Sequence, residues 1–362
     1  IRKEIKASGP DKQPQLFLVD DRWRDVSKLP ESVADELAAC IKRLEVKSAI
    51  IATEPKAHKA YIKYFLQHKV DVLVDKPLTA PANASLSLAR ARQLYADYLE
   101  LLQLSQQHPD IRLAINCKRR YSPVFNYVKK LLDQAVLELQ IPVTHISVYG
   151  GNGHWNMPPE FASREDHPHK YGYGKLLHSG YHYIDLFTWF AGSNDLLPED
   201  RRPNRIRLVQ QTQKPEDFLF QVPQTTYQKF FGKGIFDDFF QSHSPEDFAG
   251  FGETESCSVV HLLRDNRVVT SGIISLVDTT ASRRTSPYLP GPESDLSLNS
   301  GLGRIRHSQV NISVGPLLTI QVHSYKSYDE RLSPNHAGDA TKPGQLNHED
   351  VYIFRNEGII GK

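Results

Sequence analysis

The sequence contains few cysteines. Cys40, Cys117 and Cys257 are the three among 362 residues. Their odd number and wide spacing argue for reduced thiols rather than a disulfide scaffold. Long apolar runs are missing as well, since none approaches the roughly 20 residues that a membrane-spanning helix needs, and no signal-peptide pattern is present. We therefore expect a cytoplasmic protein that does not enter a membrane.

A strong excess of charge of either sign is also missing. The formal net charge is +2, so the chain has no general basic field, and nucleic acid is not an expected partner. Hydrophobic residues make up 40% of the chain and charged residues 24%, which are ordinary proportions for a globular protein. A chain of 362 residues leaves room for two domains or one large one.

The usual beginning of a protein is missing too. The chain opens with Ile1 rather than methionine, and IRKEIKASG has the character of a helix end stopped by Gly9 and Pro10. The chain closes on IFRNEGIIGK, without an evident terminal element. We expect that the natural protein extends beyond both ends of this sequence.

Strands and helices alternate along the first third of the chain. Apolar residues at helical spacing and apolar runs of strand length mark them. Strands that alternate with helices of this length indicate parallel βαβ units. The first part is therefore predicted to be an α/β domain with a doubly wound parallel sheet. Its predicted strands are 15–19, 48–53, 70–75 and 111–116, and its predicted helices are 31–44, the segment around Tyr61 and Phe65, and roughly 81–107.

The pattern changes after Cys117. A helix is predicted from about 123 to 135, then a strand near 142–150 and a helix at about 176–191. Beyond Pro203 the sequence consists mostly of alternating strands with few helices. This pattern predicts an α+β domain built on a large, mostly antiparallel sheet with an open face.

The stretch VDVLVDKPLT, residues 70–79, is the most informative local pattern. An apolar strand suited to burial on both faces runs directly into Asp75, Lys76 and Pro77. Proline cannot continue the hydrogen-bonded ladder, so the strand is predicted to stop at Lys76. Ligands bind at the carboxyl ends of strands in open α/β sheets. Lys76 is therefore either a cation that faces a ligand or an ordinary surface lysine.

The segment KLLHSGYHYIDLFTWFAG, residues 175–192, holds a second constellation. His178, His182, Asp185 and Trp189 follow one another at i, i+4, i+7 and i+11, which places them on one face of a predicted helix. Imidazole suits proton transfer near neutral pH, although such a face is also compatible with histidines satisfied in a core. Two histidines at i, i+4 also suit zinc. A convincing third ligand is missing from the sequence, and we expect no metal.

These pieces together resemble the glucose-fructose oxidoreductase, inositol dehydrogenase and rhizopine catabolism family, called Gfo/Idh/MocA. Four motifs in the same order make the resemblance specific, and they cover residues 15–192. The motifs are Thr53, Pro55 and His58 after one strand, Asp75-Lys76-Pro77 after the next, the arginine-rich turn and proline-started helix of NCKRRYSPVFNYVKKLLD at 116–133, and Gly180, His182 and Asp185 on a helix that ends at Gly192.

The resemblance implies a Rossmann-type dinucleotide-binding domain at residues 1–117, truncated so that its first strand and glycine-rich phosphate loop are missing. It implies a substrate-binding and oligomerisation domain at residues 118–362. The implied reaction moves hydride between the nicotinamide of NAD or NADP and a secondary alcohol or ketone of a sugar, sugar derivative or cyclitol. An NAD-dependent glycoside hydrolase and a non-catalytic dinucleotide-binding regulatory protein are the alternatives.

The resemblance also implies roles for individual residues. Lys76 would bind the substrate oxygen, His182 would exchange its proton, and His178 would orient His182 or bind substrate. These three form the expected catalytic set. The residues expected to bind the cofactor are Asp20, Asp21, Arg22, Thr53, Glu54, Pro55, His58, Asp75, Lys76 and Pro77. The residues expected to line the pocket for a carbohydrate-like substrate are Arg120, Tyr121, His154, Trp155, Tyr173, Lys175, His178 and Asp185.

Some positions depart from the family pattern. Asp75 stands where glutamate is usual, and His178 stands where enzymes of the inositol dehydrogenase type carry an aspartate four residues before the histidine. The proton relay is therefore altered, and the substrate class is harder to predict. The choice between NAD and NADP also stays open, because Asp20 would bind the ribose hydroxyls of NAD whereas Arg22 would receive the 2′-phosphate of NADP.

The second domain is also expected to mediate self-association. Strands near 256–263 and 268–277 would place Val259, His261 and Ile273 or Ile274 on a face with few helices to cover it. A surface this apolar favours contact with a second copy of the chain. We therefore expect a homodimer or homotetramer.

Overall fold

The computed structural model describes residues 16–361, except for 19, 21, 22, 24, 25, 27, 166, 281–304 and 328–347. The chain divides into two compact units. The first comprises Ile1–Thr79 and Tyr95–Ile115, and the second comprises Ala80–Leu94 and Asn116–Lys362. None of the described helices is both long and apolar enough to cross a membrane.

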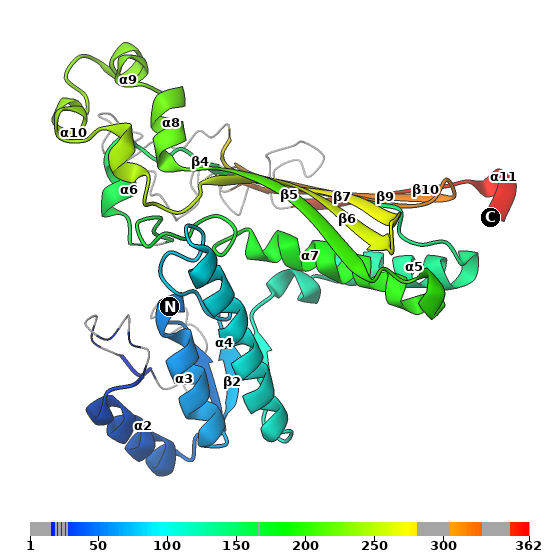
Figure 1. Ribbon diagram of the computed structural model, residues 1–362, viewed down its shortest axis with the longest axis horizontal. Helices are drawn as coiled ribbons and strands as arrows, with labels where there is room; N and C mark the ends of the chain where they lie inside the picture. Colours follow the sequence, from blue (N-terminus) through cyan, green and yellow to red (C-terminus); the bar gives the residue numbers. More distant parts are fainter. Residues whose placement is uncertain are drawn as a thin grey trace, which may run out of the picture. The chain divides into compact units, whose positions relative to one another are not determined.

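The first unit is a parallel sheet with helices packed beside it (Figure 1). Its three described strands stand in the order β1-β2-β3, and both pairings are parallel. The expected α/β class with a parallel, Rossmann-type sheet is confirmed. The elements are α2 (Glu31–Leu44), β1 (Ser48–Ile51), α3 (Pro55–Gln67), β2 (Asp71–Val74), α4 (Leu88–Gln107) and β3 (Leu113–Ile115).

The core of this unit forms where α3 packs on the strands. Ile62 and Leu66 of α3 and Val74 of β2 are fully buried in one hydrophobic cluster. Burial of each such side chain stabilises the fold by about 1.5–3 kcal/mol. Helix α2 contributes its apolar stripe through Val33 and Leu37. The hydrophobic spacing in the sequence therefore predicted the buried faces correctly.

Two predicted elements of this region differ in the structure. Residues 16–18 have no strand assignment, and Leu18 is 64% exposed. A short apolar run becomes a strand only when a neighbour pairs with it, and β1 pairs only with β2 among the described residues. The predicted helix over 81–107 begins at Leu88 instead. Asn83 has a positive φ of 62°, and its N–H donates to the carbonyl of Tyr171 at 2.8 Å, so the preceding segment is a turn.

The second unit is built on a seven-stranded sheet in the order β10-β9-β8-β4-β7-β6-β5. All pairings are antiparallel except that between β4 and β7, which confirms the expected α+β class. The strands are β4 (His145–His154), β5 (Arg205–Gln213), β6 (Glu255–Arg264), β7 (Arg267–Thr279), β8 (Ile305–Val314), β9 (Leu318–Ser327) and β10 (His348–Arg355).

Helices α5 (Pro123–Leu139) and α7 (Tyr181–Ala191) lie along one face of this sheet (Figure 1). They form one hydrophobic cluster with β4 and β6–β9. Two glycines allow the close approach. A Cβ at Gly150 of β4 would lie 2.6 Å from the ring of Tyr183, and a Cβ at Gly272 of β7 would lie 2.4 Å from the ring of Phe187.

The aromatic-rich segment between β5 and β6 folds into short helices at one end of the sheet (Figure 1). Phe161, Phe218, Phe239 and Phe248 are buried together there. The helices of this segment are α8 (Pro215–Gln221), α9 (Gln224–Phe231), α10 (Asp237–Ser242) and η6 (Pro245–Phe248), and α6 (Pro158–Ser163), which follows β4, contributes Phe161. The short elements elsewhere are η3 (Lys118–Tyr121), η4 (Gly192–Leu196), η5 (Glu199–Arg201) and α11 (Glu357–Ile360).

The sheet face opposite α7 carries a row of residues related by strand register. The row is polar in its middle and apolar toward β5 and β10. Ile274 is not part of it, because it is buried in the cluster with α7. The row runs through Tyr352, Gln321, Asn311, Ser147, Ile273, Val259 and Val209.

Candidate active site

The parallel sheet of the first unit brings the carboxyl ends of β1 and β2 to one edge. Strand β1 ends at Ile51 and β2 at Val74, so Thr53 and the Asp75-Lys76 pair follow at the same carboxyl edge. The N–H of Asp75 donates to the carbonyl of Ile51 at 2.9 Å, which extends the pairing by one residue. The peptide bond between Lys76 and Pro77 is cis.

His58 connects the two loops at this edge. Its Nδ1 lies 2.9 Å from the carbonyl oxygen of Pro77, and its Nε2 lies 3.1 Å from that of Thr53. The side chain is fully buried, and burial lowers its pKa against the opposing effect of the two carbonyls. His58 therefore positions the loops that carry Thr53 and Lys76, and its ring is not open to a ligand.

The loop after β1 has features that fit a dinucleotide. The Thr53 hydroxyl oxygen is buried and has no hydrogen-bond partner in the described part of the chain. Glu54 and Pro55 open α3, as N-cap and first helical residue, and a helix N-terminus favours phosphate and other acceptor groups. Asp20 is exposed, while Asp21 and Arg22 lie outside the described residues.

In the second unit, His178 does not lie on the helix that carries His182. The chain from Lys175 to Gly180 is a turn, and α7 begins at Tyr181. The predicted common helical face therefore holds for His182, Asp185 and Trp189 but not for His178. A Cβ at Gly180 would lie 2.4 Å from the carbonyl oxygen of Lys175 and 2.7 Å from Leu276. The chain itself therefore occupies the space beside Gly180 and leaves no room there for a ligand.

His178 is packed among other rings. Its ring centroid is 5.1 Å from that of His167, 5.6 Å from that of His169 and 5.5 Å from that of Tyr173, all edge to face. Burial lowers the pKa of His169 to about 4. No group of three or more potential ligands among the described residues could hold a metal ion. Tyr173 is fully buried, so it supports His178 rather than lining an open pocket.

Asp185 is occupied by Arg120. The guanidinium of Arg120 donates to both carboxylate oxygens of Asp185 at 2.8–3.0 Å and lies 5.5 Å from the ring of Trp189. Bidentate pairs of this kind fix both side chains. Burial, with Asp185 adding to the effect, raises the pKa of the nearby Cys117 thiol to about 11. The structure thus brings together two residues that were predicted to bind substrate, and it shows them bound to each other.

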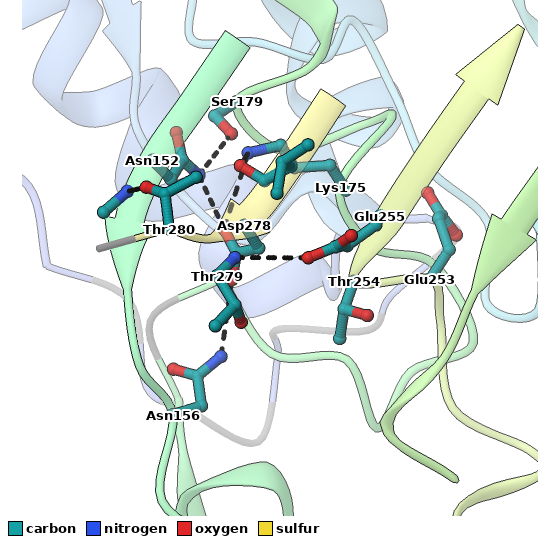
Figure 2. A network of polar contacts seen from close by, with 12 residues as sticks. Asn152, Asn156, Lys175, Ser179, Glu253, Thr254, Glu255, Asp278, Thr279 and Thr280 are labelled. Carbon is teal, nitrogen blue, oxygen red and sulfur yellow. Dashed lines mark hydrogen bonds and ion pairs between the residues drawn. The ribbon is translucent and has the colours of Figure 1, made fainter. Parts of the chain in front are cut away.

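Lys175 lies in a buried polar network at the end of β7 (Figure 2). Its side chain is 1% exposed, and its Nζ lies 3.5 Å from a carboxylate oxygen of Asp278 and donates to the carbonyl of Val277 at 3.2 Å. Asn152 of β4 donates to Asp278 at 2.7 Å and to Ser179 at 2.9 Å. The network therefore fixes the turn that precedes His182. We expected Lys175 to line the substrate pocket, but its ammonium group is buried beside Asp278.

The remaining predicted pocket residues lie in different surroundings. Tyr121 is 73% exposed. His154 ends β4, and its side chain lies outside the described part. Trp155 packs against Tyr227 and Phe231, at ring-centroid distances of 6.3 and 5.4 Å, so its ring is part of the aromatic packing there.

Sequence reasoning missed the residues that hold this site together. Asp278 and Asn152 stand about 125 positions apart and meet because β4 and β7 pair in parallel, with Gly151 opposite Val277. Tyr183 was also missed. Arg119 donates to its hydroxyl at 2.8 Å. Burial alone would raise the pKa of Tyr183, but Arg119 and other nearby groups outweigh burial and lower it. A hydrophobic strand ending in VDTT was the one signal for Asp278.

Comparison with known proteins found a family match in the N-terminal part of the chain. Residues 15–100 match the oxidoreductase family with an NAD-binding Rossmann fold. This family is Gfo/Idh/MocA, the one that the motifs resemble. The resemblance is therefore confirmed over these residues, and with it a dinucleotide cofactor of the NAD type.

Individual Gfo/Idh/MocA relatives are distant. YteT of Bacillus subtilis (strain 168), whose name describes an oxidoreductase, is 22% identical over 191 residues, which are 51% of this chain and 39% of YteT. The WlbA dehydrogenase from Bordetella pertussis, solved with NADH and UDP-GlcNAcA, gives a TM-score of 0.48 at 12% identity, over 79% of this chain and 58% of WlbA. Scyllo-inositol dehydrogenase from Lactobacillus casei gives a TM-score of 0.42 at 15% identity, over 77% of this chain and 61% of the dehydrogenase. The chain thus spans less than two thirds of each of these relatives.

Proposed function

We propose that this protein is an NAD(P)-dependent oxidoreductase acting on a secondary alcohol of a sugar, sugar derivative or cyclitol, or on the corresponding ketone. The observation that carries the proposal is Lys76, a cation held at the carboxyl edge of the sheet that matches the NAD-binding family. Ligands of open α/β sheets bind at that edge. The buried hydroxyl of Thr53 at the same edge supports the proposal.

Two side chains carry the proposed proton chemistry. A bound nicotinamide would supply or accept the hydride. The ammonium of Lys76 hydrogen-bonds the substrate oxygen and stabilises its charge as the carbon gains carbonyl character. The imidazole of His182, in the first turn of α7, takes or returns the hydroxyl proton. His178 and the Lys175–Asp278 network position the turn before His182. The proposal includes a cytoplasmic location and leaves NAD and NADP as alternatives.

A substrate screen tests the reaction class. The purified protein is incubated with NAD or NADP and a panel of sugars, cyclitols and aryl glycosides while absorbance at the nicotinamide band is followed. Net NADH or NADPH production supports the proposal. Release of aglycone without net reduction would instead identify a glycoside hydrolase. Dinucleotide binding with neither outcome would identify a regulatory protein.

The Lys76→Ala variant tests the residue that carries the proposal. It should abolish turnover and leave dinucleotide binding, measured by calorimetry, largely intact. Lys47→Ala is the matched control, because Lys47 is exposed and precedes β1 at the opposite edge of the same sheet. Full activity of Lys76→Ala would remove Lys76 from the mechanism.

A further inference from the structure

A cavity of about 370 Å³ lies within the second unit, apart from the network around Asp278. Its apolar lining includes Leu86 and Leu94 of the segment 80–94 together with Leu176 and Leu177. Polar lining residues come from the edge strand β5, from Lys214 after it and from Glu253 just before β6. A cavity of this size and mixed lining is typical of a site for a small molecule.

Glu253 is a buried carboxyl group among the residues that line this cavity. The residue is 2% exposed, and its backbone and side chain are anchored separately. The N–H of Lys175 donates to its carbonyl at 2.7 Å, and the N–H of Leu176 donates to its Oε1 at 2.8 Å. Figure 2 shows the Glu253 carboxyl group standing clear of the contacts around Asp278.

The second carboxyl oxygen of Glu253 is left without a donor. Oε2 is buried and has no hydrogen-bond partner among the described residues. Burial raises the pKa of Glu253, and the smaller opposing effect of its hydrogen bonds, of which that with the Ser85 side chain is the largest, does not reverse the shift. A buried acceptor without a donor costs free energy. A ligand that brings a donor to Oε2 would therefore gain affinity at this point.

We propose that this cavity binds a small amphipathic alcohol, with its hydroxyl donating to Oε2 of Glu253 and its apolar body against the four leucines. The site is independent of the function proposed above. A neutral donor is favoured over an ammonium group because Lys214 lines the cavity. The Lys214 ammonium donates to the carbonyl of Ala249 at 3.0 Å and lies 3.8 Å from Glu216, so it is held in place as a positive charge.

Three probes of one shape test the chemistry. Cyclohexylmethanol, cyclohexylmethylamine and cyclohexanecarboxylate share a ring and differ in the polar group. Saturation-transfer NMR and calorimetry on the whole protein should detect the alcohol with a dissociation constant on the order of millimolar, as expected for so few atoms. Binding of the amine or the carboxylate in preference to the alcohol would overturn the proposal.

Two variants locate the binding. Glu253→Gln keeps an oxygen for the Leu176 N–H and should weaken alcohol binding at least fivefold, whereas Glu246→Gln, at an exposed carboxylate, should not. Thr212→Phe fills the cavity from β5 and should abolish binding, while the adjacent Gln211→Phe, whose side chain does not line the cavity, should not. Unchanged affinity in Thr212→Phe would overturn the proposal even if Glu253→Gln failed to fold.

Discussion

At the scale of single residues, the histidines of this chain divide by surroundings rather than by sequence context. Two carbonyl oxygens face the ring nitrogens of His58, and the ring of His178 packs against those of His169 and Tyr173. His58 and His182 both lie on helices, α3 and α7. Because backbone carbonyl oxygens face both ring nitrogens of His58, we assign it a positioning role and propose His182 for proton transfer.

His182→Gln should lower the turnover number about 10²–10⁴-fold, the usual range for loss of a general acid or base. Glutamine can keep a hydrogen bond in the same place but cannot exchange a proton near neutral pH. Steady-state kinetics on the substrate found in the screen measure the effect. His68→Gln, at an exposed histidine, is the matched control. Turnover within twofold of the parent protein would contradict the assignment.

His169 should make the stability of the protein depend on pH. Its pKa is about 4 in the folded protein against about 6.5 in an unfolded chain. Between these values the unfolded chain binds more protons, so the free energy of unfolding falls as pH drops from about 6.5 to about 4, by at most ~1.4 kcal/mol per pH unit. Burial is the main cause of the low pKa; Arg164 and His167 lower it further, and Asp278 opposes them.

Urea unfolding at several pH values between 4 and 7 checks this dependence. His169→Gln should flatten the slope in that window, and His68→Gln should leave it unchanged. An identical slope in the His169 variant would show that other groups control the acid sensitivity.

At the scale of elements, the packing of α7 on the sheet depends on two glycines. Gly150→Ala or Gly272→Ala would place a Cβ at 2.6 or 2.4 Å from the ring of Tyr183 or Phe187, closer than any Cβ can remain. The helix or the strand must shift, and overpacking of this kind costs about 1–3 kcal/mol.

Chemical denaturation measures that loss of stability. Gly192→Ala is the control, because its Cβ would meet no atom closer than 3.9 Å and the backbone there is helical. Should the three variants be equally stable, the close approach of α7 to the sheet would not be the reason for glycine at Gly150 and Gly272.

At the scale of the whole molecule, the row of residues across the open face of the large sheet favours self-association. Ile273 is 40% exposed, Val259 37% and Val209 66%. The aromatic-rich helices α8–α10 gather at one end of the sheet instead of spreading over this face (Figure 1). A partner usually covers exposed apolar residues that lie side by side like these three, and a two-fold pair of copies would cover both sets at once.

Light scattering of the purified protein at micromolar concentration should give at least a dimeric mass. Ile273→Asp should weaken the dimer at least tenfold, since it buries a charge in the contact. Ile206→Asp is the matched control: Ile206 pairs with Leu262 and so lies on the other face of β5. A monomeric mass for the unmodified protein would refute the proposed assembly.

The sequence by itself determined the local features of this protein. Helices α2, α3 and α5, strands β1 to β3 and the mostly antiparallel second sheet follow from apolar spacing and from proline and glycine, because these signals act within a few residues. The Asp75-Lys76-Pro77 strand end and the His182 helix were evident for the same reason. Both are short motifs, and their functional side chains lie within a few residues of one another in the sequence.

Only the tertiary structure decided which side chains are free to act. Tyr173 and Lys175 carry polar groups suited to a ligand, yet the turn before α7 buries both, and the parallel pairing of β4 with β7 gives Lys175 its partner Asp278. Asp185 is likewise taken up by Arg120, 65 positions away. Such pairings arise from contacts between distant segments, and spacing along the chain carries no information about them.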